Sequence, residues 1–157
     1  MDDMNRDDIV GECREYTCEY HDGTQRKVFV TDHEVPYPDG RLIVSRTNPE
    51  GIITHVNQSF VEMSGYCEEE LLGQPHHILR HPEMPTSAFA DLWSTVKSGE
   101  SWQGYVKNLR KDGAHYWVKA TVIPNVRNGE VVGYTSVRRK PSRKKVQESE
   151  ALYTTMS

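Results

Sequence analysis

Hydrophobic and polar residues follow two different patterns along the second part of the chain. β-favouring triplets at 42–44 and 52–54 flank the turn-forming sequence Asn-Pro-Glu-Gly at 48–51. This arrangement predicts two antiparallel strands joined by a tight turn. From 89 to 96, large apolar residues instead recur at positions i, i+3, i+4 and i+7, which predicts a helix with one face on the core.

Two short helices are predicted between these segments. Asn57 caps the first, which ends at Gly65, and the second runs from Glu68 to Leu72. The stretch that follows, 73–85, holds three prolines, three histidines and one arginine, and its prolines exclude a long regular helix. Because rigid polar connections of this kind often carry binding groups, we interpret it as one wall of a ligand pocket.

The remaining pattern predicts three consecutive antiparallel strands. Segments 102–110 and 115–123 flank Lys-Asp-Gly-Ala, which is typical of a hairpin turn, and Asn-Gly at 128–129 precedes a last strand at 131–137. In the middle strand, alternate residues share one face: Tyr116, Val118, Ala120 and Val122. The whole order predicts an α+β fold, with short helices and one longer helix on one face of a five-stranded antiparallel sheet.

Charge divides the chain near residue 40. The formal net charge is −4, but residues 1–40 carry eleven acidic and four basic side chains. We expect an N-terminal acidic extension or cap at 1–40, one folded domain at 41–140 and a C-terminal tail or linker at 141–157. Within the extension only 27–30 has the pattern of a strand. The charge difference suggests that the extension lies against the domain, without establishing it.

Several classes of protein are disfavoured by composition. No apolar run approaches the roughly 20 residues of a membrane-spanning helix, and the acidic start is unlike a signal peptide, so we expect a cytoplasmic location. Six of the eight residues from 138 to 145 are Lys or Arg. A site for nucleic acid or anionic lipid is one reading of this run, but a solvated strand end that leads into a linker or helix is favoured.

The reactive and metal-binding residue types do not form a catalytic or metal-binding motif. Cys13, Cys18 and Cys67 make neither a disulfide framework nor a paired metal motif. No Ser-His-Asp order, supported Cys-His pair or pair of carboxylates occurs in the predicted pocket. We therefore expect neither catalysis nor a metal site.

Specific motifs resemble a known family. The order of elements, with Asn-x-x-Phe-x-x-x-Ser-Gly-Tyr at 57–66, resembles a PAS domain. Arg-His-Pro-Glu-Met-Pro at 80–85, Phe-Ala-Asp-Leu-Trp at 89–93 and His-Tyr-Trp at 115–117 narrow this resemblance to the flavin-binding PAS domain of bacterial aerotaxis transducers. Redox-sensing PAS domains of nitrogen-fixation regulators are a looser match. The resemblance covers roughly 41–140.

This resemblance implies a sensor that binds FAD non-covalently between the helices and the sheet. The redox state of the flavin would report oxygen or electron-transport status, and a conformational change would pass to a partner protein or output domain. The implied cofactor-binding residues are Asn57, Arg80, His81, Trp93, Trp102, Asn108 and Tyr116. No cysteine lies in the block at 76–81, where light-sensing relatives carry an adduct-forming cysteine, so adduct photochemistry is not expected.

Physical chemistry supports three of these assignments independently. The indole of Trp102 can stack on the flat isoalloxazine, the amide of Asn108 offers both a donor and an acceptor, and Arg80 can bind pyrophosphate through charge-assisted hydrogen bonds. Most of these residues also have a purely structural reading: Asn57 as a helix cap, Arg80 and His81 as a helix cap or a surface partner of Glu83, and the aromatic residues as core. No Gly-x-Gly-x-x-Gly element is present, so a Rossmann mode of binding is unsupported.

Two other functions stay open at this stage. One is a haem-binding PAS gas sensor with a histidine such as His81 as axial ligand, and the other is a ligand-free PAS module for protein–protein interaction. A homodimer formed through the sheet or the N-terminal cap is expected for any of the three.

Overall fold

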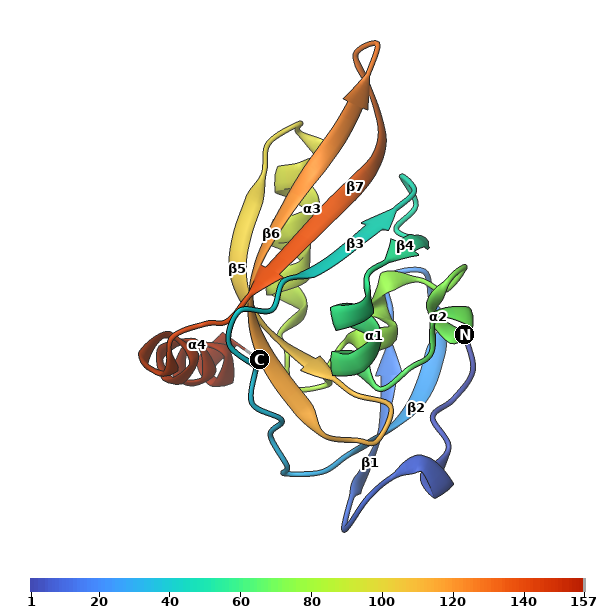
Figure 1. The fold of residues 1–157 in the computed structure, drawn as a ribbon, viewed down its shortest axis with the longest axis vertical. Helices are drawn as coiled ribbons and strands as arrows, with labels where there is room; N and C mark the ends of the chain where they lie inside the picture. The colour runs from blue at the N-terminus through green and yellow to red at the C-terminus, as the bar shows by residue number, and fades with distance from the viewer. Residues whose placement is uncertain (157) are drawn as a thin grey trace.

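The computed structural model describes residues 1–156 and contains a five-stranded antiparallel sheet in the order β4-β3-β7-β6-β5. Figure 1 shows that the hairpin of the two longest strands extends beyond the other strands. The α+β fold class predicted from the sequence is confirmed. The strands are β3 (Ile43–Thr47), β4 (Ile53–Val56), β5 (Trp102–Leu109), β6 (His115–Arg127) and β7 (Glu130–Arg139).

Short helical segments and one longer helix pack on the inner face of this sheet. The predicted face of β6 lies there, with Tyr116 and Val118 fully buried in the same core cluster as Phe60 and Val96. The segments are α1 (Gln58–Ser64), α2 (Glu68–Leu71), the 3₁₀ helix η2 (His76–Leu79) and α3 (Thr86–Lys97).

Helix α1 begins and ends as the sequence predicts. The Asn57 side chain accepts a hydrogen bond from the Phe60 backbone N–H at 3.1 Å, and Gly65 ends the helix with a left-handed φ of 78°. Asn57 also accepts from the Val44 N–H and donates to the Leu42 carbonyl. The cap therefore ties the start of α1 to strand β3.

The apolar face of α3 differs from the prediction in one respect. Val96 is completely buried, as a core position should be. Phe89, Leu92 and Trp93 are only half-buried, because they also line a cavity, although Leu92 and Trp93 pack against the core cluster as well.

Residues 1–40 contain more structure than the sequence pattern indicated. After the single-turn η1 (Arg6–Asp8), β1 (Arg14–Glu19) and β2 (Gln25–Val30) form an antiparallel hairpin. The predicted strand at 27–30 lies in β2, whereas β1 was not predicted. Most of the β1 side chains are exposed and polar, so its sequence shows no clear hydrophobic alternation.

The hairpin and the segment after it lie against the domain. Cys18, Tyr20 and the apolar end of β2 form a second core cluster with Leu109 of β5. The segment then follows the start of β6: the Thr31 N–H donates to the Gly113 carbonyl at 2.9 Å, and the Val35 N–H donates to the His115 carbonyl at 2.8 Å. Apolar contacts and backbone hydrogen bonds therefore hold the extension in place, and ion pairs join its Glu34 and Asp39 to Arg143 and Lys140.

Helix α4 (Arg143–Met156) occupies most of the predicted tail and packs on the outer face of the sheet. The Tyr153 ring stacks on Trp117, with ring centroids 6.3 Å apart, and its hydroxyl donates to the Tyr105 carbonyl at 2.6 Å. Trp117 alternates with the inward-facing Tyr116 along β6, which explains why α4 lies on the opposite face from α3.

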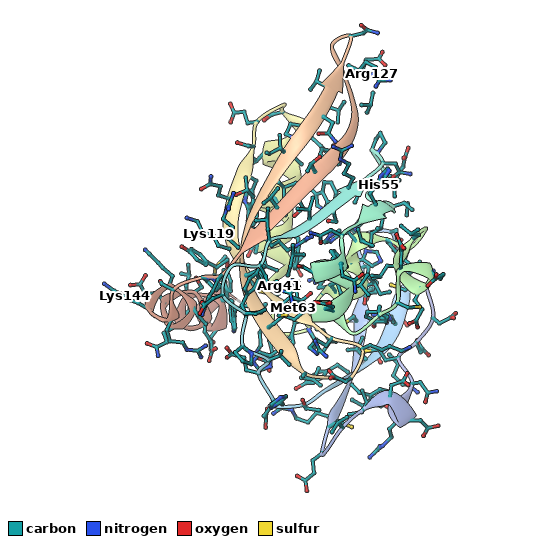
Figure 2. All side chains as sticks on the ribbon, viewed as in Figure 1. Arg41, His55, Met63, Lys119, Arg127 and Lys144 are labelled. Atoms are coloured by element: carbon teal, nitrogen blue, oxygen red, sulfur yellow. The ribbon has the colours of Figure 1, made fainter. Side chains whose placement is uncertain are left out.

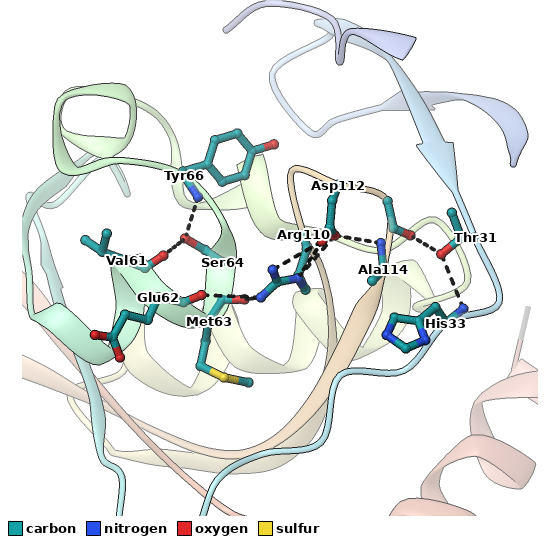
Figure 3. Close-up of polar contacts among 11 residues, drawn as sticks. Thr31, His33, Val61, Glu62, Met63, Ser64, Tyr66, Arg110, Asp112 and Ala114 are labelled. Carbon is teal, nitrogen blue, oxygen red and sulfur yellow. Dashed lines mark hydrogen bonds and ion pairs between the residues drawn. The ribbon is translucent and has the colours of Figure 1, made fainter. Parts of the chain in front are cut away.

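The turn between β5 and β6 closes the C-terminal end of α1 (Figure 3). The Arg110 guanidinium donates to the carbonyl oxygens of Glu62 and Met63 and pairs with Asp112, while the Lys111 N–H donates to the Ser64 carbonyl. These donors satisfy carbonyl groups that a helix end leaves without partners. The turn therefore fixes the orientation of α1 on the sheet.

Replacing Arg110 with alanine should lower the free energy of unfolding by about 1.5–3 kcal/mol, the range for hydrogen bonds that involve a charged group. Urea denaturation followed by circular dichroism measures this loss. Arg127→Ala, at the exposed tip of the β6–β7 hairpin (Figure 2), is the matched control and should change stability by less than about 0.5 kcal/mol. Equal losses in the two variants would contradict the proposed role of Arg110.

Candidate ligand-binding site

A cavity of about 130 Å³ lies between the inner face of the sheet, η2 and α3. Its sheet side is built from alternate residues of four strands, because every second side chain of a strand points to the same face. These residues are Ser45 and Thr47 of β3, Val106 and Asn108 of β5, Ala120 and Val122 of β6, and Tyr134, Ser136 and Arg138 of β7.

Asn108 brings an unpaired amide to the cavity. It is 4% exposed, and its Nδ2 finds no hydrogen-bond partner in the part of the chain that the structure describes. An isolated β-bridge joins Asn108 to Arg80 at the end of η2, so the two predicted residues are neighbours. Leaving a buried donor unsatisfied costs about 1–3 kcal/mol, so a ligand that accepts a hydrogen bond from Nδ2 would be stabilised here. The Asn108 side chain also interacts with the buried Tyr116 hydroxyl.

Arg138 places a buried positive charge on the cavity wall. Both Nη atoms lie 3.2 Å from Ser45 Oγ, one also contacts His76 Nε2, and the guanidinium carbon lies 5.2 Å from the Phe60 ring centroid. Among residues 1–156, no carboxylate forms an ion pair with Arg138. Burial lowers the pKa of Arg138 to about 10, so it keeps its charge at neutral pH. Such a charge favours an anionic or electron-rich ligand.

The contact with Arg138 defines the protonation state of His76. A guanidinium can only donate, so His76 Nε2 is the acceptor, and the imidazole is neutral with its proton on Nδ1. Burial and the Arg138 charge lower the pKa of His76 to about 3. Arg138 is therefore fixed by neutral groups, and its charge stays uncompensated.

Three of the seven predicted residues line the cavity: Arg80, Trp93 and Asn108. The Arg80 guanidinium lies 4.7 Å from the Phe89 ring centroid and donates to Thr86 Oγ1 at 3.2 Å. Trp93 meets Tyr134 edge to face, with centroids 5.4 Å apart.

The other four lie outside the lining. Asn57 caps α1, and Tyr116 is fully buried opposite Asn108 in the β5–β6 register. His81 is also fully buried, and its Nδ1 accepts from the Glu83 N–H at 3.1 Å. Trp102 donates through Nε1 to Asp91 Oδ2 at 2.9 Å. Cofactor contact for all seven residues stays a prediction.

The stretch 73–85, predicted to form one wall of the pocket, lines the cavity with Pro75, His76, His77, Leu79 and Arg80. Arg138 and His21 also line it, and the sequence did not single them out. Arg138 was assigned to the basic run that begins there. The alternation of Tyr134, Ser136 and Arg138 along the predicted strand could have indicated Arg138, because alternate side chains of a strand point to the same face. His21 had no such signal, because the hairpin that carries it was only half predicted.

Three further observations concern the described residues. No cluster of three or more His, Cys, Asp or Glu side chains within 1–156 could hold a metal ion. The three cysteines are free, and no helix in that range is long and apolar enough to cross a membrane.

Comparison with known proteins identifies the class. A family model described as the PAS fold matches residues 53–138. The chain belongs to the PAS-fold family.

Two relatives show what the chain is similar to. It is 46% identical over 129 residues to the aerotaxis receptor of Escherichia coli strain K12, and the match covers 82% of this chain and 26% of the receptor. It is 31% identical over 104 residues to phototropin-2 of Oryza sativa subsp. japonica, covering 65% of this chain and 11% of phototropin-2. The chain thus spans about a quarter or less of these relatives. The resemblance to aerotaxis transducers inferred from the motifs is confirmed.

A solved structure supports the same fold. It comes from work titled "Flavin Analogue Sheds Light on Light-Oxygen-Voltage Domain Mechanism" and superposes with a TM-score of 0.61 at 24% identity, over 74% of this chain and 87% of that one. At this identity the likeness concerns the fold.

Four histidines that are wholly or partly buried should make stability depend on pH. Burial lowers the pKa values of His76, His77, His81 and His115 from 6.5 to about 3, 4, 2 and 4. Between pH 6.5 and these values the unfolded chain binds more protons than the folded chain, so the free energy of unfolding falls as pH falls. Each histidine contributes at most about 1.4 kcal/mol per pH unit.

Urea denaturation at pH 7, 6 and 5 tests this dependence above the range in which carboxylates are protonated. We expect the midpoint to fall with each step and His81→Asn to make the fall shallower. A midpoint that stays constant from pH 7 to 5 would show that these imidazoles are not held neutral by the fold.

Proposed function

We propose that the chain is a redox sensor module that binds FAD non-covalently in the cavity and transmits a conformational change to a partner. The observation that carries the proposal is the convergence of an unpaired amide, Asn108, and an uncompensated cation, Arg138, on one cavity. The 46% identity to an aerotaxis receptor adds a sensory context in which a redox cofactor has a use.

The residues present fit a flavin. The pyrimidine edge of an isoalloxazine carries carbonyl acceptors and an N–H donor, which match an asparagine amide and a guanidinium. Leu79, Phe89 and Trp93 provide apolar and aromatic walls for the ring system. The cavity, at about 130 Å³, is smaller than the roughly 300–1,000 Å³ of typical ligand pockets, so a cofactor of this size would extend through the mouth.

A bound flavin would supply reversible electron transfer, and the chain would tune it. Arg138 holds a fixed positive charge at the cavity wall, so negative charge added there is favoured. His76 keeps its proton on Nδ1 and orients the guanidinium.

A change in the charge of the ligand would act first on the Asn108 side chain. Its amide can present either Nδ2 or Oδ1, and a ligand that gains charge or a proton changes which of the two is preferred. Asn108 lies in β5, paired with Tyr116 of β6, so a reoriented amide would shift the sheet. Such coupling requires that the two ligand states favour different conformations of the chain.

The outer face of the sheet is the proposed route to a partner. Ile123 of β6, which shares the outer face with Trp117, is 43% exposed, and the end of the β6–β7 hairpin adds the exposed Val126 and Val132, at 58% and 46%. Helix α4 covers the β5 side of this face and leaves the hairpin free. We also propose that the chain forms a homodimer through this face or through the N-terminal cap. For the haem alternative, His81 does not line the cavity, whereas His21, His76 and His77 do.

Flavin retention tests the proposal. The protein should be incubated with FAD, freed of unbound cofactor, and its absorption recorded before and after dithionite and again in air. The wild type should retain flavin whose bands bleach and return. Asn108→Ala should weaken FAD binding by about tenfold, the effect of one lost hydrogen bond in a buried site.

Lys119→Ala, on the exposed side of β6 (Figure 2), is the control and should bind as the wild type does. A wild-type protein that retains no flavin would overturn the proposal. A Soret band would support the haem sensor, and a protein that stays colourless would support the interaction module.

A further inference from the structure

We propose that the β1–β2 hairpin is part of the ligand site: His21 binds the phosphate-bearing part of the flavin at the cavity mouth, while Tyr20 and Arg26 position η2. This inference rests on the proposed flavin function and deepens it. The hairpin lies outside the PAS-fold match at 53–138, so the site would combine the family fold with a segment that precedes it.

His21 stands at the mouth of the cavity. It lies in the turn between β1 and β2, and its side chain lines the cavity together with His77. The two imidazoles meet edge to face, with centroids 5.9 Å apart. His21 is exposed, so its ring can contact a ligand that extends out of the cavity.

Tyr20 fixes the orientation of His77. The two rings are parallel within 2°, with centroids 3.9 Å apart, and Tyr20 is 4% exposed. Burial lowers the pKa of His77 to about 4, so its ring is neutral. Its Nε2 is buried and has no hydrogen-bond partner among residues 1–156, which leaves this atom available to a ligand.

Arg26 ties the hairpin to the backbone of η2. It is 3% exposed, and its guanidinium donates to the Ile78 carbonyl at 2.9 Å and to the Tyr66 hydroxyl at 3.1 Å. Its Nε donates to the Asp2 carbonyl at 2.8 Å. The hairpin therefore contacts η2 at two adjacent residues, through the ring stack on His77 and the Arg26 hydrogen bond to the Ile78 carbonyl.

The groups at the mouth suit a phosphate. His21 and His77 present imidazoles and Arg80 a guanidinium, and these are donors that bind phosphate oxygens; one carboxylate, that of Glu50, also lines the cavity. Because the cavity is too small for a whole dinucleotide, the ring system must occupy the interior and the phosphates the mouth. The hairpin thus selects phosphate-bearing flavins over riboflavin.

Flavin fluorescence titrations with FAD and with riboflavin test the role of His21. His21→Ala should weaken FAD binding by about five- to tenfold, the effect of one charge-assisted hydrogen bond, and leave riboflavin binding unchanged. His33→Ala is the matched control, because this exposed histidine of the same extension does not line the cavity. Wild-type protein that binds neither flavin would overturn the proposed function itself. Unchanged FAD affinity in His21→Ala, with a wild type that binds, would overturn only this inference.

Tyr20 needs a test that separates positioning from general stability. Tyr20→Phe keeps the ring and should retain binding, whereas Tyr20→Ala should lose affinity for both flavins. Hydrogen–deuterium exchange of residues 76–80 should be faster in Tyr20→Ala than in Tyr20→Phe, with protection of β5–β7 unchanged. If Tyr20→Ala shows the same exchange and the same flavin affinity as the wild type, η2 is positioned without the ring stack.

Discussion

The arrangement of the cavity depends on one buried guanidinium without a counter-charge. Arg138 is held by Ser45, His76 and the Phe60 ring, all of them neutral. Burying a charge without an opposite one is costly, so a fold that does so usually uses the charge. Here the charge faces a cavity that is also lined by Asn108. The Nδ2 atom of Asn108 has no hydrogen-bond partner among the described residues. Both features are explained together by a ligand that is electron-rich and accepts hydrogen bonds.

Contacts from the other elements hold the cavity-lining strands close to η2. The strand register aligns Ser45, Ser136 and Arg138 on one face, and the bridge between Arg80 and Asn108 brings the proline-rich segment to the same place. The β5–β6 turn anchors α1, and the N-terminal hairpin supports η2 from outside. A change at the cavity can therefore reach both the sheet and the hairpin through direct contacts.

The sequence predicted the sheet, helices α1–α3 and the family, because strong periodicity and specific motifs carry those features. It predicted Arg80, Trp93 and Asn108 at the cavity, yet it missed Arg138, since a strand residue inside a basic run looks like a solvated charge. Strand β1 was missed because its side chains are mostly polar and exposed. Helix α4 was left as a tail because only Val146, Ser149 and Tyr153 bury surface on the sheet, too few for a clear helical pattern.

The reduction potential of bound flavin in Arg138 variants tests the central claim most directly. A fixed positive charge at the cavity wall stabilises the more negative, reduced ligand, so Arg138→Gln should shift the potential to more negative values. Arg138→Lys keeps the charge and should lie closer to the wild type. If Arg138→Gln binds flavin with the wild-type potential, the buried guanidinium does not act on the ligand, and the role proposed for Arg138 is wrong.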